Sequence, residues 1–254
     1  MPRFAHPDFA YTPLVTRLGY YMGVPAADIS ALDALPYREQ RFDRGDVIIA
    51  RGASINWVVL VTSGWAARSR NTRSGDRQII NILLPGDIVT PDVFVLHRLD
   101  HEIEALSTVT IRFLEKPDLQ ALLERAPGLA TALWWAAAQE DSIVREHVVR
   151  LGRRNAIERI AHFLLEMHRR LMIVKQADEG AMILPLTQLE IADALGLSNV
   201  HVNKTLFKLE DLGHIRRQKT VTQLLNIPAL AALCDFDTLY LHLEADQAVS
   251  QGTS

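Results

Sequence analysis

Short hydrophobic runs separated by glycine turns dominate residues 37–114 of this 254-residue chain. The apolar runs are VIIA, WVVLV, QIINILL and VTIRFL, and between them fall Gly45, Gly52, Gly64, Gly75 and Gly86. Runs rich in Val, Ile and Leu, bounded by regularly spaced turn residues, predict short strands of a compact antiparallel barrel or roll. A helical segment is expected before this region, at about 13–35, with a mobile lead-in at 1–12.

After Pro117 the hydrophobic spacing becomes helical. From about Arg125 to Leu151, apolar residues recur on one face at helical steps, namely Leu133, Ala137, Val144, Val148 and Leu151, and Trp134, Trp135 and Ile143 widen this seam toward the β-domain. The pattern fits either coiled-coil-like self-association or an amphipathic helix packed within its own chain. Gly152 is expected to break the helix, and a second helix is expected over 153–175.

Residues 187–212 carry the ordered signals of a helix-turn-helix. Thr187 precedes Glu190 by three, as in a capping box, and Gly196 suits a backbone that leaves the helical conformation. Ser198 can then cap a second helix whose buried side is formed by Val202, Leu206 and Leu209. HIRRQKTVTQLLNI, residues 214–227, follows as a predicted β-hairpin with a basic tip. This order predicts a winged helix-turn-helix whose second helix, about 198–210, enters the major groove of DNA.

Residues around the second helix divide into two groups of expected DNA contacts, and Ser198 at the start of the helix is a further expected contact. Base edges are expected to face Asn199, Val200, His201, Asn203 and Lys204; of these, asparagines can pair with adenine, whereas Val200 offers only apolar contact, for example to a thymine methyl. The alternative is that Val200 is partly buried and His201 touches only the backbone. Phosphates are expected to be held by Thr187, Gln188, Lys208, Arg216, Arg217 and Lys219.

Composition narrows the function classes. With 48% apolar and 22% charged residues the chain reads as an ordinary globular protein, and no apolar run is long enough for a membrane span. A single cysteine, Cys234, excludes an intrachain disulfide and argues against a Cys-rich zinc or iron–sulfur site. No secretory signal is evident, which together with the lone cysteine favours a cytoplasmic location. No metal site or cofactor is predicted.

Catalytic motifs are also missing from the sequence, which contains no GxSxG, P-loop, HExxH or Rossmann fingerprint. The nine histidines are scattered, and His162 and His168 are expected to be solvated on a helix surface. We therefore do not expect an enzyme. Charge is distributed unevenly. Residues 151–226 hold 11 Lys and Arg against 8 Asp and Glu, whereas the whole chain has a formal net charge of −3. This mild excess agrees with a nucleic-acid partner but does not require one.

LTQLEIADALGLSNVHVNKTLFKLEDLGHI resembles the DNA-binding domain of the Crp/Fnr family of bacterial transcription regulators. RGDVIIARGASINWVVLVTSGWAARSR and RSGDRQIINILLPGDIV are similar in glycine placement to the family's cyclic-nucleotide-binding β-roll. The resemblance implies an α+β fold: an N-terminal antiparallel β-roll at 1–117, a dimerisation helix and hinge at 118–152, a winged helix-turn-helix at 153–240 and a disordered tail at 241–254. It further implies a homodimer on a pseudo-palindromic operator, with RNA polymerase as a further partner.

The effector site departs from the family pattern. Members that bind cyclic nucleotides carry Gly-Glu just after the PGD turn and an Arg about ten residues on, and the Arg pairs with the cyclic phosphate. Thr90 and Pro91 stand at the Gly-Glu position here, and Arg98 is the cation nearest to the Arg position. Acidic neighbours (Asp92, Asp100, Glu102 and Glu104) would repel a phosphate. Cyclic AMP is therefore not expected. The effector is unknown or absent, with Asp92, Arg98 and His101 as candidate pocket residues.

The recognition helix departs as well. Well-known members carry Glu at the position of Val200 and Arg at that of Lys204, so we expect an operator unlike those of cyclic-AMP-responsive or Fnr-like members. The N-terminal cysteines that an Fnr-like iron–sulfur cluster requires are absent from this sequence. Haem would need His97 or His101 as a ligand, and a lone surface histidine does not indicate a haem site. The alternative function is a small-molecule-binding β-roll whose helix-turn-helix serves protein contacts.

Overall fold

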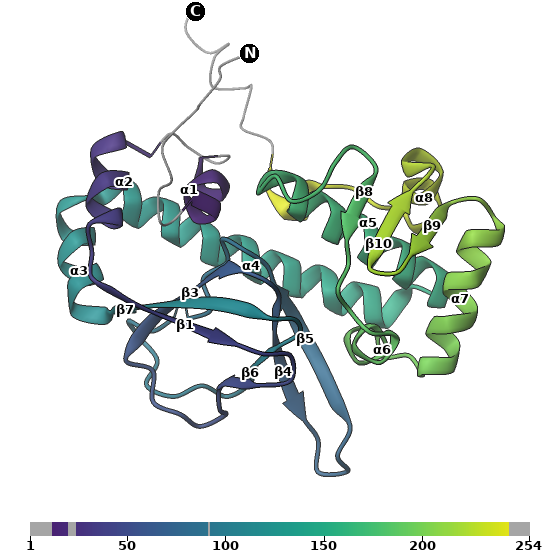
Figure 1. Cartoon of the computed structure of the whole chain (residues 1–254), viewed down its shortest axis with the longest axis horizontal. Coiled ribbons are helices and arrows are strands. Elements are labelled where there is room, and N and C mark those ends of the chain that lie inside the picture. Colours follow the sequence, from purple (N-terminus) through teal and green to yellow (C-terminus); the bar gives the residue numbers. More distant parts are fainter. Residues whose placement is uncertain (1–11, 20–23, 91, 244–254) are drawn as a thin grey trace, which may run out of the picture.

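Two antiparallel sheets form the N-terminal half of the molecule (Figure 1). The computed structural model describes residues 12–19, 24–90 and 92–243. The strand orders are β1-β7-β3 and β2-β6-β4-β5. The bounds are Tyr37–Phe42 (β1), Val47–Ile49 (β2), Trp57–Ser63 (β3), Ala66–Asn71 (β4), Arg77–Leu83 (β5), Glu102–Ala105 (β6) and Val109–Glu115 (β7). The β-roll predicted from the glycine spacing is confirmed.

Three of these strands escaped the sequence analysis because their hydrophobic signal is weak. β1 reads YREQRF and is exposed along nearly its whole length, β4 reads AARSRN, and β6 has only four residues. The predicted turns hold: all five turn glycines have positive φ. At Gly64 a Cβ atom would lie 2.1 Å from the Thr108 carbonyl oxygen, so the close approach of two loops requires glycine there.

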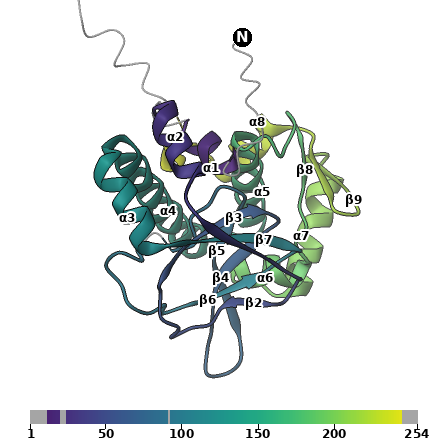
Figure 2. The same ribbon diagram turned by 60° about the vertical axis from the view of Figure 1, so that its left-hand side comes forward.

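Four helices lie on one side of the roll, with α3 and α4 side by side (Figures 1 and 2). They are α1 (Thr12–Leu18), α2 (Ala26–Asp33), α3 (Lys116–Arg125) and α4 (Pro127–Arg153). The predicted break at Gly152 is wrong, because α4 runs through it to Arg153. A single exposed glycine in a long helix costs only about 1 kcal/mol. The helix ends because Arg154 is extended (φ −94°, ψ 143°) and Asn155 caps the next helix.

The C-terminal domain consists of helices around a small three-stranded sheet of order β8-β10-β9. Its elements are α5 (Ala156–Ile173), β8 (Ala181–Ile183), α6 (Gln188–Leu195), α7 (Asn199–Asp211), β9 (Ile215–Gln218), β10 (Val221–Leu224), α8 (Ile227–Cys234) and the 3₁₀ turn η1 (Leu239–Leu241). The predicted hairpin is β9–β10, and α8 follows it directly. β8 was not predicted.

Hydrophobic packing joins the two domains. One core fills the β-roll and reaches α4 through Leu129, Ala132 and Trp135. A second core combines Ile79 and Ile82 of β5 with α5, α6 and α7. The C-terminal domain therefore packs directly on β5 of the β-roll. Among the described residues, no helix is both long and apolar enough to cross a membrane.

Both termini of the chain were predicted to lack order. Residues 1–11 and 244–254 lie outside the described residues. For 241–243 the prediction is wrong, because Leu241 and Leu243 are 0% and 8% exposed and pack against Ile143 and Ile173.

Candidate nucleic-acid interface

Two caps define the turn between α6 and α7. The Thr187 hydroxyl accepts from the Glu190 amide at 3.1 Å, and the Glu190 carboxylate accepts from the Thr187 amide at 2.6 Å. Gly196 ends α6 in the left-handed conformation (φ 60°). The Ser198 hydroxyl then accepts from the His201 amide at 3.2 Å and starts α7. The caps predicted from the sequence are confirmed, and they fix the direction of α7.

α7 has one buried and one open side. Val202, Leu206 and Leu209 are at most 2% exposed and belong to the second core. On the other side Val200 is 65% exposed, and Asn199, His201 and Lys204 are exposed too, with Asn203 half-buried at the edge. The alternative of a partly buried Val200 is therefore wrong. Figures 1 and 2 place α7 on the side of its domain that faces away from the β-roll.

The β9–β10 hairpin supplies cations beside α7. Arg216 and Lys219 are exposed, and Lys219 occupies the tip with φ 54°. Lys208 is exposed on the last turns of α7, and Thr187 and Gln188 lie at the start of α6, exposed and half-buried. Such a set can hold phosphates on either side of a helix in a groove.

Arg217 does not fit the predicted phosphate role. Its guanidinium donates to the Glu210 carboxylate at 2.7 Å and lies over the Phe207 ring at 5.4 Å from the centroid. The hydrogen bond from Arg217 holds the pKa of Glu210 below its ordinary value, so the pair is charged. We conclude that Arg217 anchors the hairpin to α7.

The segment after the PGD turn faces a charged side chain of its own chain. The Arg68 guanidinium donates to the carbonyl oxygens of Ile88 and Val89 at 3.2 and 3.0 Å and pairs with the Glu140 carboxylate of α4 at 2.9 Å. Thr90 is fully buried; its hydroxyl donates to the Trp57 carbonyl at 2.9 Å and accepts from the Val59 amide at 3.0 Å. Pro91 lies outside the described residues. Backbone groups of this segment are therefore engaged within the chain.

The three predicted effector residues do not form one site. Arg98 is exposed and donates to the Gly52 carbonyl oxygen at 2.8 Å, and it lines an open hollow of about 560 Å³ together with Arg51 and Asp100. Asp92 and His101 do not line this hollow. His101 instead hydrogen-bonds Asp100 at 2.7 Å. That bond is the main reason why the pKa of Asp100 is lowered.

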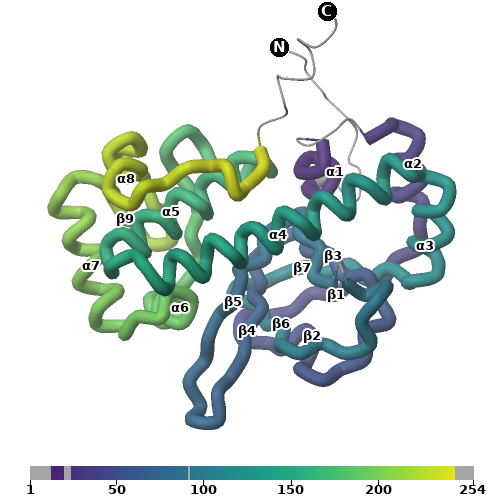
Figure 3. The backbone as a smooth tube through the Cα atoms, turned by 180° about the vertical axis from the view of Figure 1, so that it is seen from behind, coloured from purple at the N-terminus to yellow at the C-terminus, as the bar shows by residue number. Residues whose placement is uncertain are grey.

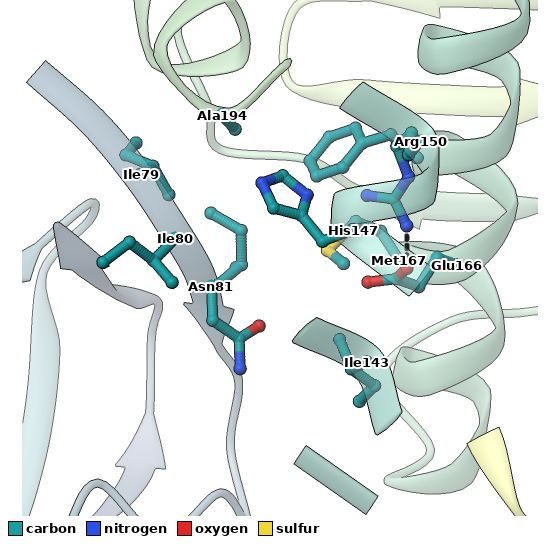
Figure 4. A pocket seen from close by; sticks show the side chains of 11 residues that line it. Ile79, Ile80, Asn81, Ile143, His147, Arg150, Glu166, Met167 and Ala194 are labelled. Atoms are coloured by element: carbon teal, nitrogen blue, oxygen red, sulfur yellow. Dashed lines mark hydrogen bonds and ion pairs between the residues drawn. The ribbon is translucent and has the colours of Figure 1, made fainter. Parts of the chain in front are cut away.

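A small cavity with both apolar and polar walls lies where β5 meets α4, α5 and α6 (Figure 4). Its walls include Ile79, Asn81, His147 and the buried pair Arg150–Glu166, and the His147 ring points toward β5. Burial, followed by the nearby Arg150 charge, lowers the pKa of His147 to about 4. At neutral pH this histidine is uncharged. No sequence signal pointed to this cluster, because its members come from four separate elements.

α4 presents a different face to solvent from the predicted seam. Trp135 and Ile143 are buried as expected, but Trp134 is 79% exposed, so the prediction that it faces the β-domain is wrong. Val148 is 64% exposed, and the other seam residues are half-buried, namely Leu133, Ala137, Val144 and Leu151. The open stripe runs through positions 134, 138, 141, 145 and 148. Steps of four and three along that stripe are coiled-coil spacing.

The predicted solvation of two histidines is also wrong. His162 and His168 are 1% and 7% exposed. Burial, followed by Arg150 and Arg154, lowers the pKa of His162 to about 2. The His168 Nε2 atom lies 2.8 Å from the Asp178 carbonyl oxygen. Both rings are parts of the core, and neither belongs to a group of metal-ligating side chains within the described residues.

Comparisons with known proteins agree with this architecture. Residues 158–233 match the Crp-like helix-turn-helix domain, and residues 39–126 match the cyclic nucleotide-binding domain. The nitrogen fixation regulation protein FixK of Bradyrhizobium diazoefficiens is 32% identical over 197 residues, which are 75% of this chain and 82% of FixK. The transcriptional activator protein FnrL of Cereibacter sphaeroides is 26% identical, over 74% of this chain and 76% of FnrL.

The solved structure of FixK2 from Bradyrhizobium japonicum superposes with a TM-score of 0.71 at 28% identity, covering 78% of this chain and 98% of FixK2. Similarity thus extends through the β-roll, the long helix and the helix-turn-helix in one order. The chain belongs to the Crp/Fnr family and is a transcription regulator with a helix-turn-helix DNA-binding domain.

Proposed function

We propose that this chain is a homodimer that binds a pseudo-palindromic operator through α7, without cyclic AMP. The observation that carries the proposal is the open side of α7: Asn199, Val200, His201 and Lys204 are exposed above three buried anchors. A recognition helix of this kind reads base edges in the major groove while flanking cations hold phosphates. Lys208, Arg216 and Lys219 are the flanking cations, and Thr187 and Gln188 contact the backbone from α6.

The dimer forms, in this proposal, along the open stripe of α4. Trp134 and Val148 are large apolar side chains left exposed there, and Leu133, Ala137, Val144 and Leu151 flank them. Asp141 and Arg145 lie between the apolar ends and pair within the helix. Self-association along this stripe would bury both large apolar side chains, Trp134 and Val148, which supports this surface as the contact with a second copy.

In the sequence, Thr90 and Pro91 stand where cyclic-AMP-binding members carry Gly-Glu. Arg68 and Glu140 occupy the space next to the segment that follows the PGD turn, and Thr90 is bonded to β3. The pair also joins β4 to α4. This supports DNA binding by the protein without a bound nucleotide. The regulator acts in the cytoplasm, with RNA polymerase as a further partner.

Genome-wide binding in the native host tests the proposal. Wild-type protein should occupy a limited set of promoters that share one pseudo-palindrome. A variant with Asn203→Ala and Lys204→Ala should lose these sites although it is present at the same level and still dimeric. Unchanged occupancy by that variant would favour the alternative, in which the helix-turn-helix serves protein contacts.

A further inference from the structure

Residues 235–243, here called the C-terminal strap, return from the DNA-binding domain to the middle of α4 (Figure 3). They follow the segment that matches the Crp-like helix-turn-helix domain, which ends at residue 233. Asp235 turns the chain out of α8 in the left-handed conformation (φ 50°). The strap then lies across the joint between the long helix and α5, so it touches the elements on both sides of that joint.

On the α4 side the strap is held by polar and apolar contacts. The Gln139 amide donates to the Leu241 carbonyl oxygen, and Ser142 Oγ lies 3.0 Å from His242 Nε2. Leu241 is fully buried and packs with Ile143 of α4. Gln139 also accepts two bonds from Arg17 of α1, at 2.8 and 3.1 Å, so its amide is fixed from both sides.

On the α5 side the strap is held by aromatic rings. Phe236 and Tyr240 lie 5.0 and 5.8 Å from the His162 ring, centroid to centroid, the first edge-on and the second stacked. The Tyr240 hydroxyl donates to Glu166 at 3.1 Å, and Glu166 is paired with Arg150 of α4. Burial, followed by the Glu166 charge, raises the pKa of Tyr240 well above its ordinary value, so the hydroxyl stays a donor.

The joint between α4 and α5 consists only of Arg154 and Asn155, and these two residues alone do not fix the angle between the helices. α4 ends at Arg153 and α5 begins at Ala156, with an extended Arg154 between them. Arg154 donates to the Cys234 carbonyl oxygen at 3.0 Å, immediately before the strap, and pairs with Glu146 of α4 at 2.6 Å. Arg154 therefore ties the end of α8, where the strap begins, to α4, while the strap itself contacts α4 and α5. Together these contacts restrict rotation at the joint.

We infer that the C-terminal strap is a positioning element that sets the angle of the DNA-binding domain on α4 and thereby the separation of the two α7 helices in the dimer. The inference rests on the proposed function. Half-sites of such dimers lie about 34–36 Å apart, and each added base pair moves them by about 3.4 Å. A rigid joint rejects an operator with altered spacing, whereas a loosened joint tolerates it.

The test compares operators whose half-site spacing is native, one base pair shorter or one base pair longer. The main variant is Phe236→Ala with Tyr240→Ala, which removes both rings from His162. Tyr240→Phe keeps the ring and removes only the bond to Glu166. The matched control is Leu239→Ala, because Leu239 lies in the same strap and is 79% exposed. Affinities are measured by fluorescence anisotropy, together with binding to an isolated half-site and sedimentation of the free protein.

Wild type and Leu239→Ala should prefer the native spacing by at least about tenfold. In the double variant this ratio should fall to about threefold or less, while half-site binding and dimerisation stay unchanged. Tyr240→Phe should give an intermediate ratio, and it serves as the test if the double variant does not fold. An unchanged ratio in the folded variants, or a loss of half-site binding equal to the loss on the full operator, would overturn the strap's role. Failure of wild type to select any DNA would overturn the proposed function and the strap's role with it.

Discussion

The β-roll segment after Asp87 and the helix α7 correspond to the effector site and the DNA-binding site of this family. The polar groups of these two regions behave in opposite ways. Arg68, Thr90 and Glu140 are buried; Arg68 pairs with Glu140 Oε2, and Arg68 and Thr90 also bind nearby backbone. Asn199 and Lys204 on α7 are exposed, and their side chains form no hydrogen bond to the described part of the chain. Polar groups that are hydrogen-bonded within the chain stabilise its structure. Exposed polar groups without such bonds, held on a rigid scaffold, are available to bind a partner.

Breaking the buried pair should have the largest effect. Arg68→Ala leaves Glu140 buried without its partner, which typically costs about 3–5 kcal/mol of unfolding free energy. The double variant Arg68→Met with Glu140→Leu should recover most of that loss, because both charges leave together. Urea unfolding measures each value. A single substitution that costs less than about 1 kcal/mol would show that the pair does not hold the roll to α4.

Removing a side chain that contacts DNA, on α7 or on the hairpin, should change DNA binding and leave the free energy of unfolding unchanged. Asn203→Ala should weaken operator binding by about 1–3 kcal/mol and relax sequence choice at one base pair. Lys219→Ala, on the hairpin tip, should weaken binding to all sequences alike and lower the salt dependence by about one counterion. Anisotropy titrations at several salt concentrations separate the two. Equal losses on operator and random DNA for Asn203→Ala would contradict a base contact.

Removing the Ser198 cap of α7 should have a smaller effect on stability. This cap links the stability of α7 to DNA binding. Ser198→Ala loses the acceptor for the His201 amide, and such a change costs about 1 kcal/mol. Ser198→Gly should cost only a few tenths, because glycine leaves the helix end open to water. Thermal unfolding followed by circular dichroism gives both values. Equal effects of alanine and glycine would mean that the hydroxyl is not the cap.

Adding cyclic AMP should have no effect on stability. A ligand at a thousandfold excess over its dissociation constant would stabilise the folded state by about 4 kcal/mol. With Arg68 and Glu140 beside the segment after the PGD turn, we expect an unchanged melting temperature up to millimolar nucleotide. A saturable rise would contradict the account of the β-roll. Arg68→Ala serves as the informative comparison, because it vacates that space.

Local signals made much of α6 and α7 predictable, since Thr187, Gly196 and Ser198 act on residues three or four positions away. The Arg68–Glu140 pair and the strap were not predictable, because they join segments far apart in the sequence. Neither was the burial of His162, whose neighbours Phe236 and Tyr240 come from the strap. On α4, periodicity indicated a seam but placed Trp134 on the wrong side. The exposed stripe lies one residue along from the predicted seam, and what packs on the helix decides such a shift.

Selection from a random duplex library with nucleotide-free protein tests the central claim most directly. The predicted result is one enriched pseudo-palindrome with half-sites a helical turn apart, unlike the operators of cyclic-AMP-responsive or Fnr-like members, and its loss when Asn203 and Lys204 are both changed to alanine. Recovery of no sequence, or of the same sequence by that variant, would contradict recognition of DNA by α7.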